Sequence, residues 1–148
     1  MSPANIIEEF LIAIEQRNFT KAEDLLSNSF KVTGVAPDTL DASGFMSIHR
    51  ALGNGIPDFR FNYEFLKEKG GAVNVRFHIT GTHTKSMPAP YAGLRTIAPT
   101  NKSVNMPDEQ VEFTVRDNKI QKLQVTHVEG GGLPGLLKQI GVDLRVEA

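Results

Sequence analysis

Two of the four histidines in the 148-residue chain are placed where an imidazole could act as an acid or a base. His83 lies near the end of residues 72–85, in which apolar and polar side chains alternate as in a β-strand with one apolar face. His127 follows Leu123 and Val125 at the same spacing. If the sheet curls over a helical layer, both imidazoles point into the enclosed space. We predict His83 as a general base and His127 as its partner; the alternative is that each is a core histidine.

Glu109 is a third catalytic candidate, because it has the same strand parity as the apolar residues Val111 and Phe113. Pro107 makes a bulge possible at this point, so we favour a solvated position for Glu109 over an inward one. His49 falls beside apolar residues of a predicted helix, and we interpret it as a half-buried surface histidine.

Aromatic and aliphatic side chains on the predicted strands would line a pocket for a small apolar molecule. Residues 59–66 alternate with an aromatic face, which a Gly70-Gly71 turn connects to the strand that contains His83. Tyr63 is either a hydrogen-bond partner in the pocket or a core residue whose hydroxyl finds another partner. The predicted ligand-binding residues are Tyr63, Phe61, Phe77, Val111 and Phe113.

The order of elements predicts a single α+β domain that covers residues 1–148. Ser2-Pro3 begins a helix that ends near Asn18, and residues 20–23 form a capping box for a second helix. A third helix starts after Asp41 or Ser43. Strands follow, interrupted by a proline-rich excursion over residues 86–101, and a short helix starts at Pro134.

Composition excludes several classes of function. A formal charge of −1 argues against nucleic acid or an anionic membrane as a partner, and the chain has no cysteine for a disulfide or thiolate site. The spacing of the histidines matches no metal motif, so we expect neither a metal nor another cofactor. No apolar window approaches the length of a membrane span, and the N-terminus lacks a secretory pattern. We therefore predict a cytoplasmic protein.

Several short motifs, in order and over most of the chain, resemble the SnoaL-like polyketide cyclases of the nuclear transport factor 2-like superfamily. The motifs are PDFRF at 57–61, VRF at 75–77, GTHT at 81–84, PTNKSV at 99–104, DNKI at 117–120 and LPGLLKQIG at 133–141. The resemblance implies a cone formed by a curved antiparallel sheet, with the N-terminal helices on its concave face, and a homodimer through the outer sheet face. The polar residues that would suit such an interface are Arg76, His78, Thr80, Glu112, Thr114 and Gln124.

The chain departs from the family pattern at the residues that the family uses for catalysis. Val111 stands where the family has an acid/base aspartate, and Leu123-Gln124 stands where it has His-Trp; His83 matches the family's histidine. Two hypotheses follow. In the first, the chain cyclises or isomerises an apolar carbonyl compound by histidine acid/base chemistry. In the second, it is a non-catalytic module that binds a ligand or forms a dimer.

Overall fold

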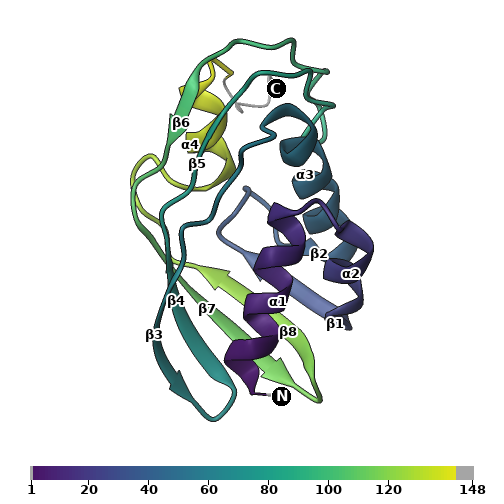
Figure 1. The fold of residues 1–148 in the computed structure, drawn as a ribbon, viewed down its shortest axis with the longest axis vertical. Coiled ribbons are helices and arrows are strands. Elements are labelled where there is room, and N and C mark those ends of the chain that lie inside the picture. The colour runs from purple at the N-terminus through teal and green to yellow at the C-terminus, as the bar shows by residue number, and fades with distance from the viewer. Residues whose placement is uncertain (1, 143–148) are drawn as a thin grey trace.

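The computed structural model describes residues 2–142, which form four helices and eight strands (Figure 1). The helices are α1 (Pro3–Glu15), α2 (Phe19–Asp24), α3 (Ala42–Gly55) and α4 (Gly132–Gln139). The strands are β1 (Leu26–Thr33), β2 (Leu40–Asp41), β3 (Glu64–Lys69), β4 (Ala72–Phe77), β5 (Thr80–Thr82), β6 (Ser103–Asn105), β7 (Glu109–Arg116) and β8 (Lys119–Val125). The predicted α+β class is confirmed.

Six strands form a curved sheet in the order β2-β1-β8-β7-β4-β3, and β5 and β6 form a separate pair. All neighbours in the large sheet are antiparallel except β1 and β8, which run parallel. The tight turn between β7 and β8 is the predicted one: Asp117 and Asn118 both have positive φ, of 55° and 59°. Helix α1 crosses one face of the sheet, in contact with β4, β7 and β8 (Figure 1).

The N-terminal helices are fixed by side chains that cap their free amides. The Ser2 hydroxyl accepts a hydrogen bond from the Asn5 amide at 3.2 Å, and Asp41 caps α3 through the Gly44 amide at 2.8 Å. The predicted capping box at residues 20–23 is wrong, because α2 begins earlier. Asn18 is its N-cap and accepts from the Lys21 amide at 3.3 Å.

The long strand predicted over residues 72–85 is divided in two. The ladder between β4 and β7 ends at the pair Phe77 and Glu109. Two residues further along, the partner of Ile79 would be Pro107, which has no N–H to donate. The chain therefore leaves the large sheet and continues as β5, paired with β6. His83 is buried, as the alternation predicts, but it follows a strand of the small β5–β6 pair and not a strand of the large sheet.

The aromatic strand predicted over residues 59–66 is also shifted. Asn62 has a φ of 48°, which interrupts the extended backbone, and β3 begins only at Glu64. Phe59 and Phe61 precede this break and are buried nonetheless. They lie on a connecting segment that pairs with the β4–β5 junction through a bridge between Arg60 and Thr80.

The proline-rich excursion lies between β5 and β6, and two backbone hydrogen bonds between Met87 and Ile97 fold it back on itself. The Tyr91 hydroxyl donates to the Asp38 carboxylate at 2.7 Å. The helices of the described residues include none long and apolar enough to span a bilayer.

Candidate functional site

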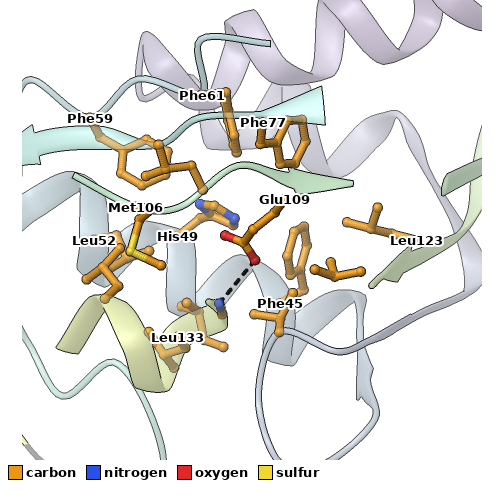
Figure 2. A pocket seen from close by; sticks show the side chains of 16 residues that line it. Phe45, His49, Leu52, Phe59, Phe61, Phe77, Met106, Glu109, Leu123 and Leu133 are labelled. Carbon is orange, nitrogen blue, oxygen red and sulfur yellow. Dashed lines mark hydrogen bonds between the residues drawn. The ribbon is translucent and has the colours of Figure 1, made fainter. Parts of the chain in front are cut away.

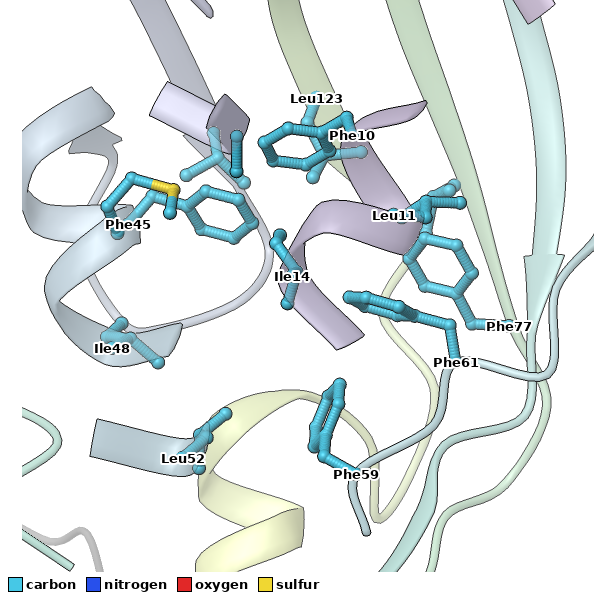
Figure 3. Close-up of a cluster of buried hydrophobic side chains, with 14 of the residues drawn as sticks. Phe10, Leu11, Ile14, Phe45, Ile48, Leu52, Phe59, Phe61, Phe77 and Leu123 are labelled. Carbon is cyan, nitrogen blue, oxygen red and sulfur yellow. The ribbon is translucent and has the colours of Figure 1, made fainter. Parts of the chain in front are cut away.

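An apolar pocket of about 60 Å³ lies between helices α3 and α4 and the segments that carry the aromatic residues (Figure 2). Helix α3 supplies Phe45, His49 and Leu52, and α4 supplies Leu133 and Leu136. Phe59, Phe61 and Phe77 close another side and pack against one another as part of the hydrophobic core (Figure 3). Two polar side chains, Glu109 and His49, line this otherwise apolar space.

Glu109 is the first residue of β7, and only 4% of it is exposed. Its neighbours on the same face, Val111 and Phe113, are buried as well, so the solvated position favoured from the sequence is wrong and the inward alternative is confirmed. Burial raises the pKa of the Glu109 carboxyl, and a hydrogen bond to the Gly132 amide partly opposes that shift. The Gly132 amide donates to Oε2 at 3.1 Å, so Glu109 also holds the first residue of α4.

His49 is 6% exposed, and the interpretation of it as a half-buried surface residue is wrong. Its imidazole packs edge-on against Phe45, with ring centroids 4.7 Å apart, and lies 5.8 Å from Phe59 and from Phe61. Burial in these surroundings lowers the pKa of His49 from 6.5 to about 4, so the ring is neutral at pH 7. Its Nδ1 is enclosed and has no hydrogen-bond partner in the part of the chain that the structure describes.

His83 is fully buried, but it does not line the pocket. Its Nδ1 lies 2.9 Å from the Thr100 hydroxyl and accepts the Thr100 amide at 3.3 Å. The His83 backbone bonds to Asn101 and Lys102 in addition. These contacts attach the end of the proline-rich excursion to the residue after β5, which gives His83 an evident role in the fold. Burial lowers the pKa of His83.

The structure separates the other predicted site residues. His127 is exposed beyond the end of β8, so the prediction that it shares an enclosed space with His83 is wrong. Tyr63 lies outside the pocket and donates to Glu8 on α1 at 2.9 Å. Phe61 and Phe77 do line the pocket, whereas Val111 and Phe113 are buried in the core away from it.

The arrangement unites one carboxyl group and one neutral imidazole in a dry, aromatic space. Of the two polar side chains that line the pocket, the sequence identifies Glu109 as a candidate site residue and does not identify His49. His49 was missed, although its position four residues after Phe45 and three before Leu52 placed it on the apolar face of α3. A carboxylate whose pKa is raised by burial is a stronger base than one in water, and it can remove a proton from an acidic carbon.

The family model for SnoaL-like polyketide cyclase matches residues 5–126. No curated protein matches the chain. Among solved structures, IdmH from Streptomyces antibioticus, a proposed polyketide cyclase, aligns with a TM-score of 0.68 at 18% identity, over 96% of this chain and 100% of its own.

A proposed polyketide cyclase from Pseudomonas putida KT2440 aligns with a TM-score of 0.69 at 13% identity, over 94% of this chain and 98% of its own. AclR from Streptomyces galilaeus, a proposed hydroxylase, aligns with a TM-score of 0.67 at 15% identity, over 94% and 80% of the two chains. At such identities, the likeness establishes the shared fold.

Proposed function

The chain belongs to the SnoaL-like polyketide cyclase family, and we propose that it cyclises or isomerises a small apolar carbonyl compound by acid/base chemistry, with Glu109 as the base. The observation that carries this proposal is a buried carboxyl group in an otherwise apolar pocket. Val111 stands at the position of the family's aspartate. Glu109 lies two residues earlier on the same face of β7, and in this proposal it takes over the aspartate's role as the base. This assignment moves the base from His83, which lies outside the pocket.

The chemistry needs a carbon acid whose proton faces the Glu109 carboxylate. Oε2 is held by the Gly132 amide, so Oε1 is the oxygen available to take up the proton. The C–H bond breaks, the proton passes to Glu109, and the electron pair forms an enolate. Isomerisation returns the proton to a different carbon. Cyclisation joins the enolate carbon to a second carbonyl carbon of the same molecule, whose oxygen becomes an alkoxide and takes up the proton from Glu109.

The size of the pocket limits what can enter it. A volume of about 60 Å³ holds roughly two water molecules, and it is less than half of the roughly 150 Å³ of a cavity that binds benzene. We propose that the ketone end of a larger molecule, such as the acetyl group of acetophenone, occupies this space among Phe45, Phe59 and Phe61.

The proposal can be tested with a model ketone in place of the natural substrate, by following the exchange of its acidic C–H protons for deuterium from the solvent. Acetophenone, a single-ring ketone with acidic methyl protons, is incubated in D2O with the protein, and loss of the methyl signal is followed by NMR. We expect exchange that saturates with ketone concentration and exceeds the rate in buffer alone. Saturable binding without exchange above the buffer rate would contradict the proposed catalysis.

That second outcome would support the alternative, a non-catalytic module that binds a ligand in the same pocket. The observation that favours this alternative is the hydrogen bond between Glu109 and Gly132, because a carboxylate at the start of a helix stabilises the helix without any chemistry.

We also propose a homodimer through the outer face of the large sheet. Phe113 packs against Phe10 of α1, so Glu112 and Thr114 lie on the opposite face. Asn74 and Gln124 belong to that face too, and they border a shallow polar depression together with Glu112. Light scattering over a dilution series is expected to give the mass of a dimer; a monomer at micromolar concentration would contradict it.

A further inference from the structure

We propose that His49 donates a hydrogen bond to the carbonyl oxygen of the bound ligand. This inference rests on the proposed function, in which the same hydrogen bond is made to the enolate oxygen that forms when Glu109 removes a proton. The natural ligand is then an apolar ring compound with a ketone oxygen directed at α3 and an acidic carbon directed at β7. His49 would be a catalytic residue, because it touches the oxygen on which charge develops.

The first support is the position of the imidazole in the pocket. His49 and Glu109 are the only polar side chains among the described residues that line it. Figure 2 shows the imidazole and the carboxyl group turned toward the same part of the cavity. A carbonyl compound that enters this part of the cavity would meet both a hydrogen-bond donor and a base, whereas the aromatic residues around them offer only apolar contact.

The second support is the position of the proton on the ring. Nδ1 is enclosed and has no partner among residues 2–142, which leaves Nε2 as the nitrogen through which the imidazole can reach a ligand. An orphaned buried N–H is rarer than an orphaned acceptor. The proton therefore belongs on Nε2, where it can be donated to the ligand.

The third support is the charge state that the surroundings impose. The aromatic rings of Phe45, Phe59 and Phe61 surround the imidazole and disfavour its charged form. A neutral imidazole carries one N–H and binds a carbonyl oxygen without adding a charge to the apolar pocket. In a site of low dielectric constant such a hydrogen bond strengthens as the oxygen gains negative charge.

The test uses acetophenone labelled with ¹³C at the carbonyl carbon, together with ethylbenzene, which has the same shape without the oxygen. We expect the infrared carbonyl band of the bound ketone to lie at lower frequency than in hexane. His49→Phe is expected to abolish this shift and to weaken acetophenone binding about tenfold, while leaving ethylbenzene binding unchanged. Phenylalanine suits the site because three phenylalanines already surround it.

Two further variants separate the inference from its alternatives. Glu109→Gln is expected to keep the infrared shift, because the donor is His49. His49→Gln retains an N–H donor on a side chain of similar reach and is expected to restore part of the shift, which a purely structural role would not produce. A shift that persists in His49→Phe, or that disappears in Glu109→Gln alone, would overturn the inference, as would the absence of ketone binding to the wild-type protein.

The outcomes also distinguish this inference from the proposed function. A His49-dependent shift without proton exchange would sustain the hydrogen bond and contradict catalysis. Exchange without a His49-dependent shift would sustain catalysis and contradict the role of His49.

Discussion

Glu109→Gln is expected to slow the protein-catalysed proton exchange of acetophenone by about 10²- to 10⁴-fold, the usual contribution of a general base. Glutamine has almost the same shape and keeps an oxygen that can accept the Gly132 amide, so the start of α4 is preserved. What the variant loses is the ability to take up the proton. The measurement is the exchange rate by NMR at saturating ketone, with circular dichroism to establish that the variant is folded.

The pH dependence of proton exchange by the wild-type protein is an independent test of Glu109 as the base. The base must be ionised, and burial raises its pKa above the ordinary 4.5. The rate is therefore expected to be low in acid and to rise with pH through a midpoint above 4.5.

Glu112→Gln is the matched control for Glu109→Gln, because Glu112 lies on the opposite face of the same strand, outside the pocket. It makes the same change in charge and is expected to leave the rate unchanged. An unaltered rate in Glu109→Gln would show that another group removes the proton.

Val111→Asp is expected to destabilise the protein by about 4 kcal/mol at pH 7. Val111 is buried between Val75 and Val125 on the neighbouring strands, and it does not line the pocket. A carboxyl group there stays protonated in the folded chain, while in the unfolded chain it ionises near pH 3.9. The penalty therefore grows as the pH rises above 3.9 and shrinks as it falls toward that value.

Urea unfolding of Val111→Asp at pH 7 and at pH 4.5 measures this effect. Val111→Asn is the matched control, because it is similar in size and cannot ionise, so its loss of stability should depend little on pH. If Val111→Asp were as stable as Val111→Asn at pH 7 and exchanged ketone protons faster than the wild type, position 111 would face the pocket. That result would contradict the assignment of the base to position 109.

Local signals in the sequence were sufficient for most of the fold. Ser2 and Asp41 cap the helices they were expected to cap, and the Asp117-Asn118 turn joins β7 to β8. The errors arose where distant residues decide the outcome. The long strand is interrupted because Pro107 stands opposite Ile79, and neither residue alone gives a reason for the break.

The site could be predicted only in part for the same reason. The inward parity of Glu109 can be counted from the sequence, because strand parity is a local property and β7 continues without a bulge from Glu109 to Thr114. The sequence alone does not show that Pro107 leaves this count undisturbed, and for that reason it favours a solvated position. The burial of His49 depends on elements remote in sequence, since α4 and the segment with Phe59 and Phe61 close the pocket around it. The alternation correctly predicts that His83 is buried, but the sequence does not show the break after Phe77, which places His83 beside a separate pair of strands and outside the pocket.

The contact between Glu109 and the first residue of α4 has a consequence for how position 109 responds to selection. Because burial raises its pKa, the carboxyl group favours the folded state only in acid, below about 4.5, and this contribution is lost as the pH rises through the raised value. At neutral pH a glutamine would hold Gly132 as well without that cost. Selection for heat tolerance alone would then favour glutamine, whereas selection for turnover would retain glutamate at the expense of stability.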